Sequence, residues 1–150
     1  YSVFTVDAIA LPKLQAAGLD GVLGSKNTQQ WSPDIDNAAN KRFVGDYLKK
    51  YGKYPSFYGA QSYDSIMLIK SAVEAVEGNL HDKSGIRKAL KSANYNSVRG
   101  KYSYGNNHMP VQNFYLREVV ADDEGRWTTK IVSTVYKNHQ DPYASQCKLK

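Results

Sequence analysis

Cysteine is almost absent from this sequence. Its single copy, Cys147, lies near the C-terminus. One thiol cannot form a disulfide within the chain, and a zinc site built from several Cys and His ligands is excluded by the count. The sequence therefore leaves two alternatives: a free thiol in a C-terminal tail, or a thiol whose partner lies in a chain segment that is absent here.

Sequence motifs for catalysis and cofactor binding are also lacking. The chain contains no G-x-S-x-G, no P-loop, no G-x-G-x-x-G and no H-E-x-x-H. Its three histidines, His81, His108 and His139, lie in polar, turn-like segments without Cys or carboxylate at ligand spacing. The "DIDN" stretch at 34–37 starts like a calcium loop but lacks that loop's glycine and distal glutamate, which favours a helix cap. We therefore expect neither an enzyme nor a bound cofactor.

Long apolar runs are missing, whereas positive charge is in excess. The sequence has no stretch of 18 apolar residues, so it predicts no membrane-spanning helix. Lys and Arg number 20 against 14 Asp and Glu, giving a net charge of +6 that is concentrated in residues 81–150. A basic nucleic-acid or interaction module is one alternative. The basic residues are spread singly, however, which favours a solvated surface over a contiguous binding stripe.

The pattern along the chain predicts strands, then helices, then a hairpin. Apolar spacing and turn residues place the elements. We expect strands at 1–6 and 21–25, a polar loop at 27–35, and helices at 10–18, 34–52 (capped by Asp36), 55–78 and 81–94. A short hairpin or irregular segment follows at 97–112. Strands at 113–120 and 126–136 flank a turn at 121–125, and the rest is a tail. Such an order is typical of an α/β fold that ends in a β-hairpin.

The helix expected at 55–78 raises a functional question. Apolar residues recur on it at helical spacing, including Ile66, Ile69 and Val73, and Gly78 is a natural C-terminal stop. Three side chains with polar tips, Tyr58, Gln61 and Tyr63, crowd its N-terminal end. They are explained either by packing or by the wall of a small-molecule pocket.

The sheet predicted from these strands is too small. Two short parallel strands cannot be covered by helices on both faces, as parallel sheets are. We therefore expect the chain to rely on more sheet than it encodes.

Four segments, in this order, resemble a known family. They are "QAAGLDGVLGS", "NKRFVGDYLKKYGKYPSFYGAQSYDSIMLIKSAVEAV", "SVRGKYSYGNNHMPVQNFYLREVV" and "DPYASQC". Together they resemble the C-terminal half of the type I periplasmic solute-binding proteins of ABC transporters. The branch is the leucine/isoleucine/valine-binding type, close to members that take up amino acids or small aromatic acids.

The resemblance implies an architecture and a set of partners. The family has two three-layer α/β/α lobes joined by three crossing strands, with the ligand between the lobes. Residues 1–52 would be the end of the C-terminal lobe, 53–113 the segment returning to the N-terminal lobe, and 114–150 the final crossing, closing hairpin and tail. Expected partners are a small-molecule ligand, an ABC permease, and the missing N-terminal half or a second copy. The expected location of the protein is the periplasm. A ligand-sensing receptor domain of the same fold stays an alternative.

The resemblance also suggests site residues. In the family, the loop after the strand that matches residues 1–6 supplies a ligand contact, which in amino-acid binders is an acid facing the ammonium group. Phe4, Thr5 and Asp7 are the candidates here. Asp7 would favour an amino acid, whereas Phe4 or Thr5 in that position would favour an aromatic acid. Before the helix at 55–78 the family places an aromatic contact, which Tyr58 matches, with Gln61 as a further candidate.

Overall fold

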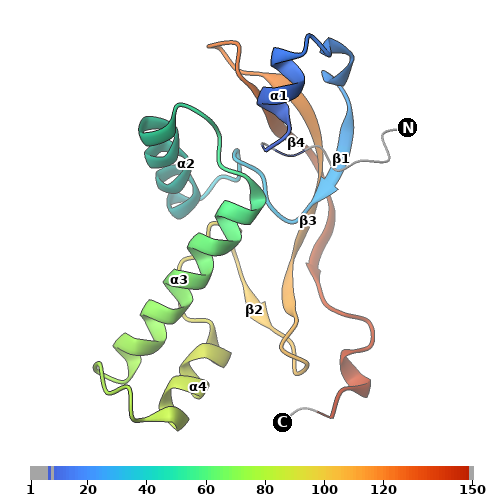
Figure 1. Cartoon of the computed structure of the whole chain (residues 1–150). Coiled ribbons are helices and arrows are strands. Elements are labelled where there is room, and N and C mark those ends of the chain that lie inside the picture. The colour runs from blue at the N-terminus through green and yellow to red at the C-terminus, as the bar shows by residue number, and fades with distance from the viewer. Residues whose placement is uncertain (1–6, 8, 149–150) are drawn as a thin grey trace.

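A long antiparallel hairpin forms the spine of the molecule. The computed structural model describes residues 7 and 9–148. Strands β3 (Pro110–Ala121) and β4 (Trp127–His139) pair along most of their length and run through the whole molecule (Figure 1). Strand β1 (Lys26–Gln29) pairs with β3 near the hairpin turn, and β2 (Ser103–Tyr104) pairs with the start of β3. Within the described residues, every strand pairing is antiparallel.

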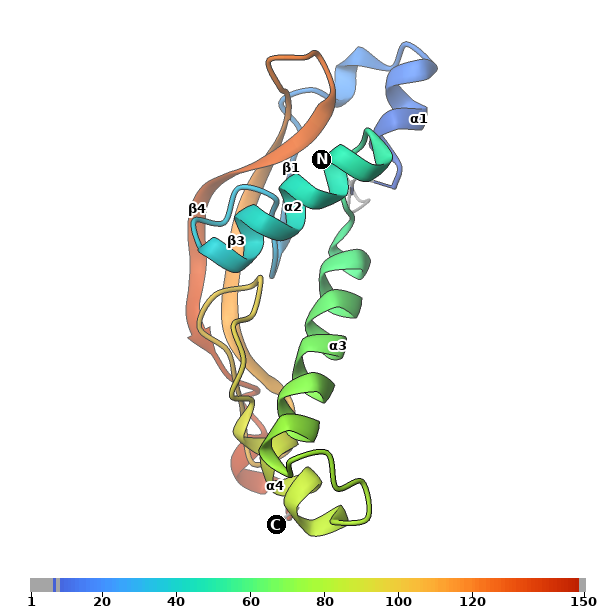
Figure 2. The ribbon, with the colours of Figure 1, turned by 90° about the vertical axis from the view of Figure 1, so that its left-hand side faces the viewer.

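The helices gather around the two ends of this hairpin. Helix α1 (Leu11–Ala16) packs near the hairpin turn, together with β1. Helices α3 (Phe57–Ala75) and α4 (Lys83–Ser92) pack on each other at the opposite end, beside β2 (Figures 1 and 2). Helix α2 (Ala38–Tyr51) lies close to the beginning of α3. The molecule is therefore elongated, with two groups of elements bridged by β3 and β4.

The pairing of β3 with β4 is irregular in the middle of the hairpin. Register shifts occur between Gln112 and Phe114, between Phe114 and Tyr115, and between Leu116 and Arg117. Such irregularities bend a strand pair and increase its twist. The hairpin is thus bent where it passes from one group of elements to the other.

Local signals explain where the helices begin and end. The Asn37 side chain accepts a hydrogen bond from Asn40 N, and the Asp82 side chain accepts one from Gly85 N, so each satisfies a first-turn donor. Gly52 ends α2 with φ +66°, a left-handed conformation that glycine adopts without steric cost. The four predicted helices are confirmed, although the one expected at 34–52 begins only at Ala38. Asp36 as the cap of α2 was wrong: Asn37 takes that place, and Asp36 pairs with Lys41 instead.

The strand predicted at 21–25 is wrong. Asp20–Val22 form a 3-10 turn, Gly24 has φ +80°, and the strand begins only at Lys26. The apolar residues of 21–25 suggested a strand, but the chain turns at Asp20–Val22 and first meets β3 at Gly24, whose N–H donates to the Val119 carbonyl at 2.9 Å. As a result, the first residues of the predicted loop at 27–35 belong to β1. The strand expected at 1–6 lies outside the described residues.

The C-terminal half follows the prediction more closely. The two hairpin strands are confirmed, and the segment 97–112 contains the short β2 pairing with the start of β3. The tail is more ordered than expected, because β4 continues to His139 and a 3-10 turn covers Ala144–Gln146. Asn106 donates from Nδ2 to the Ala144 carbonyl at 2.7 Å, which fixes this turn against the β2–β3 connection.

Two apolar clusters hold the elements together. The larger one joins α2, α3 and β3 to two loops and contains Trp31, Ile35, Phe43, Val44, Ala60, Val98 and Tyr115. Tyr63 packs on it with its ring centroid 4.9 Å from that of Phe43, so packing explains this tyrosine. The smaller cluster, Leu11, Val119 and Trp127, fastens α1 to the hairpin. In the part of the chain that the structure describes, each helix is too short or too polar to cross a membrane.

Candidate ligand-binding site

The predicted site residues that the structure describes lie around the N-terminus of α3. Ser56 caps this helix by accepting a hydrogen bond from Gly59 N at 3.2 Å. The Phe57 N–H donates to Asp7 Oδ2 at 3.3 Å, so a carboxylate from the start of the chain reaches the same helix end. A negative charge at a helix N-terminus is stabilising. Asp7 therefore joins two segments that are far apart in sequence. Phe4 and Thr5 lie outside the described residues.

Asp7 is enclosed by the protein. Only 7% of its surface is exposed, and the fully buried Arg117 guanidinium lies within electrostatic reach of it. Burial lowers the pKa of Arg117 below its ordinary value, while the negative charges of Asp7 and Asp34 act in the opposite direction. Arg117 is also held by Asn27 Oδ1 and the Trp31 carbonyl, at 2.6 and 2.9 Å. The negative charge of Asp7 thus acts against the desolvation of the buried Arg117 guanidinium.

Tyr58 is the exposed member of the predicted set. It is 58% exposed, and its ring lies against that of Phe57 with the centroids 3.9 Å apart. An accessible aromatic face on a rigid helix end is a surface on which a flat or apolar ligand packs well. Gln61 is half-buried one turn further along. It borders a separate cavity of 320 Å³ with Asp64, Arg99 and Tyr104.

Another cavity lies beside the first turn of α3. It has a volume of 270 Å³ and is formed by Ile9, Pro12, Lys13, Tyr47, Lys53, Tyr54 and Ser56. Four of its seven lining residues are apolar or aromatic, one is Ser56, and the two charged ones are lysines. The described residues around the first turn of α3 are therefore suited to bind an organic anion.

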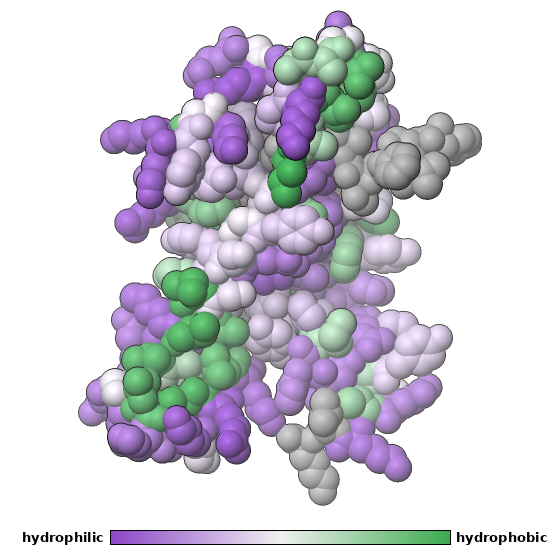
Figure 3. All heavy atoms as spheres, in the orientation of Figure 1, coloured by the Kyte–Doolittle hydropathy of each residue, from purple (hydrophilic) through white to green (hydrophobic). Residues whose placement is uncertain are grey.

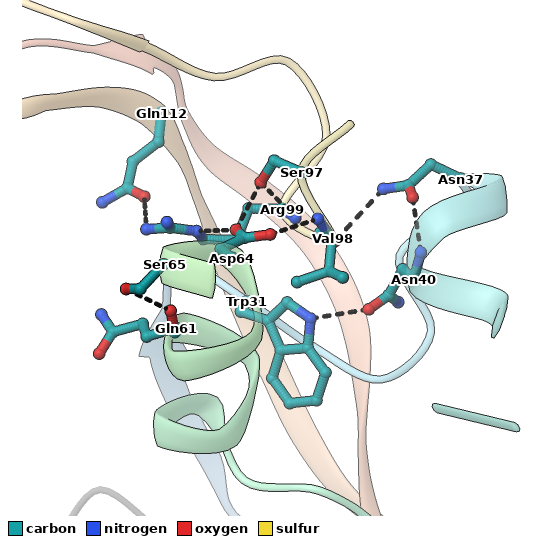
Figure 4. Close-up of polar contacts among 10 residues, drawn as sticks. All are labelled: Trp31, Asn37, Asn40, Gln61, Asp64, Ser65, Ser97, Val98, Arg99 and Gln112. Carbon is teal, nitrogen blue, oxygen red and sulfur yellow. Dashed lines mark hydrogen bonds and ion pairs between the residues drawn. The ribbon is translucent and has the colours of Figure 1, made fainter. Parts of the chain in front are cut away.

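The most connected polar cluster is one that sequence reasoning missed. Asp64, 1% exposed, accepts hydrogen bonds from Ser97 Oγ (2.6 Å), Val98 N (3.0 Å) and Arg99 Nε (2.8 Å). Figure 4 shows the Arg99 guanidinium between the Asp64 carboxylate and Gln112, to whose Oε1 it donates at 3.1 Å. The sequence signal that could have indicated this cluster is Asp64 itself, an acid within the largely apolar run "YDSIMLI".

Aromatic side chains close this cluster. The Arg99 guanidinium lies 4.2 Å from the centroid of the Tyr102 ring, and burial raises the pKa of Tyr95 to about 12. Because its polar groups are paired with one another, the cluster fastens residues 97–99 to α3. It is suited to a structural role. Among the described residues, no group of three or more His, Cys, Asp or Glu side chains is placed to hold a metal ion.

Comparisons with known proteins relate the sequence of this chain to a family. A family model for periplasmic binding proteins matches residues 2–125. A Leu/Ile/Val-binding protein homologue from Brucella abortus is 29% identical over 126 residues, which cover 82% of this chain and 32% of that protein. The chain thus spans about a third of the length of the curated relatives that it matches.

Solved structures extend the comparison to the fold. A solute-binding protein of an ABC transporter from R. palustris, in complex with benzoate, superposes with a TM-score of 0.78 at 29% identity, covering 96% of this chain and 37% of that one. A leucine-binding protein from Thermotoga maritima gives 0.63 at 25% identity, covering 82% and 34%. The sequence match and the structural match agree over most of the chain, and the chain belongs to the family of periplasmic binding proteins.

Proposed function

We propose that the protein containing this chain is the extracytoplasmic solute-binding component of an ABC importer. It holds a small amino acid or aromatic carboxylate between two lobes and presents the closed form to a permease. In this arrangement residues 1–52 end one lobe, residues 53–113 return to the other lobe, and residues 114–150 cross back and close the first.

The course of the β3–β4 hairpin carries this proposal. The hairpin links the α1–β1 group to the α3–α4–β2 group. Two of its three register shifts lie between the residues of β3 that pair with β2 and those that pair with β1, and the third lies within the part that pairs with β1. Residues 52–56 make a further connection between α2 and α3. A few extended connections with local irregularities are suited to hinge bending between two rigid bodies. A ligand that contacts both bodies would shift the open–closed equilibrium toward the closed form.

Tyr58 is the proposed ligand contact on this chain. It lies at the start of α3, next to the connection at 52–56, and its ring is accessible. A ligand that stacks on the ring removes apolar surface from water and gains an aromatic contact worth about 0.5–1.5 kcal/mol beyond the burial term. Replacing Tyr58 by alanine should therefore weaken binding about 10-fold.

Calorimetry on the complete protein tests the proposal. The ligands are benzoate, 4-hydroxybenzoate, leucine and phenylalanine, and we expect at least one dissociation constant of about 1 μM or tighter. Tyr143→Ala is the matched control, because Tyr143 is 68% exposed and lies in the C-terminal segment. It should leave affinity unchanged. If none of the four ligands binds, the proposed function is wrong. If Tyr58→Ala and Tyr143→Ala weaken binding equally, the proposed role of Tyr58 is wrong.

A further inference from the structure

The geometry points to an organic acid without an α-ammonium group as the ligand class of this site. Asp7 is a positioning residue for α3 and does not contact the ligand. This inference rests on the proposed function and narrows it, because the family resemblance leaves amino acids and aromatic acids equally open.

The burial of Asp7 is the first argument. Its exposed fraction is 7% in a chain that spans about a third of its relatives' length. Any additional chain that packs on this conformation can only reduce that exposure. A ligand that arrives from solvent therefore meets other groups before it meets this carboxylate.

The charge of Asp7 is already compensated, which is the second argument. The Phe57 N–H donates to Oδ2 at 3.3 Å, at the positive end of the α3 dipole. The buried cation Arg117 lies within electrostatic reach as well. An ammonium group at Asp7 would also feel the charge of this buried guanidinium, and like charges in a buried place repel each other. Asp7 is placed to hold a helix end and not to receive a cation.

The surroundings of the helix start supply the third argument. The adjacent cavity has lysines, Lys13 and Lys53, as its charged residues and aromatic walls from Tyr47 and Tyr54. Tyr58 adds an exposed ring at the same helix end. Lysines beside an apolar surface favour a ligand that combines a carboxylate with an apolar group. They disfavour a ligand that also carries a positive charge.

Two pairs of ligands that differ only in the ammonium group provide the test. They are 3-phenylpropanoate with L-phenylalanine, and 4-methylpentanoate with L-leucine, titrated into the complete protein by calorimetry. We expect the acid of at least one pair to bind 10-fold or more tightly than its amino acid. If the amino acid binds as tightly as the acid or more tightly in both pairs, the inference is overturned while the proposed function stands. If none of the four compounds nor benzoate binds, both fail.

Asp7→Asn separates a positioning role from ligand contact. The amide keeps the shape and an acceptor for Phe57 N but loses the negative charge that acts on Arg117. We expect a lower melting temperature with an unchanged ratio of affinities within each pair. A selective loss of amino-acid affinity would show that Asp7 contacts an ammonium group. Asp46→Asn, at an exposed position of α2, is the control and should change neither quantity. If Asp7→Asn does not fold, the ligand pairs on the unaltered protein still decide the ligand class.

Discussion

Replacing Asp64 by alanine should strongly destabilise the fold. The two charged side chains are 1% (Asp64) and 7% (Arg99) exposed, so the change leaves a buried guanidinium without its counter-charge. Ser97 Oγ and Val98 N lose their acceptor at the same time. Breaking one partner of a buried ion pair costs about 3–5 kcal/mol. Since small proteins are stable by only about 5–15 kcal/mol, this is a large fraction of the total.

Urea unfolding followed by tryptophan fluorescence measures this loss. Trp31 shares the larger apolar cluster with Val98, so its emission reports on the affected region. With a slope of about 2 kcal/mol per M, the midpoint should fall by about 2 M.

Two further variants distinguish the effect of breaking the buried ion pair from the effect of removing any negative charge. Asp46→Asn removes an acid from an exposed pair with Arg42, whose side chains are 74% and 80% exposed, and should cost less than about 0.5 kcal/mol. Combining Asp64→Leu with Arg99→Met should restore most of the stability, because it leaves neither charge unpaired. A loss below about 1 kcal/mol for Asp64→Ala would refute the reasoning.

Three other changes have defined outcomes. Asn40→Ala leaves Trp31 Nε1 without its acceptor at 2.8 Å and should cost about 2–3 kcal/mol in the same urea assay. Burial raises the pKa of Tyr95 from 10.0 to about 12, so its contribution to stability is present below pH 10 and is lost as the pH rises toward 12. Tyr95→Phe should flatten that alkaline loss in unfolding free energies measured across the range. Burial acts to raise the pKa of Asp122, but hydrogen bonds from Arg126 and others lower it below 3.8. The stabilisation is therefore present above pH 3.8 and is lost as the pH falls further, and Asp122→Asn should remove this acid dependence.

Local signals predicted the helices and the hairpin well. In α2, Phe43 and Tyr47 are one helical turn apart and their ring centroids lie 6.1 Å apart, and Gly52 ends the helix. These features depend on residues close together in sequence. For the same reason the turn between β3 and β4 could be placed from its composition.

Features that depend on distant residues could not be predicted. The strand β1 has the sequence Lys-Asn-Thr-Gln, without the apolar alternation that marks a strand, and it exists because β3 offers backbone partners. The burial of Arg117 depends on Asn27 and the Trp31 carbonyl, which contact it from 90 and 86 residues away. For the candidate site, the sequence singled out Asp7 and Tyr58 as candidate ligand contacts. It could not show that one would be buried and the other exposed.

The apolar periodicity of helix α3 did not predict which of its faces is buried in the described structure. Ala60, Asp64 and Ala72 are buried and share one side of the helix. At 100° per residue, Ile66 and Ile69 lie on the opposite side, where they are 65% and 53% exposed. Figure 3 shows apolar side chains gathered over this part of the molecule. The sequence does carry apolar residues at helical spacing on one face of α3. The described elements nevertheless bury the opposite face, because residues 97–99 pack there and bind Asp64.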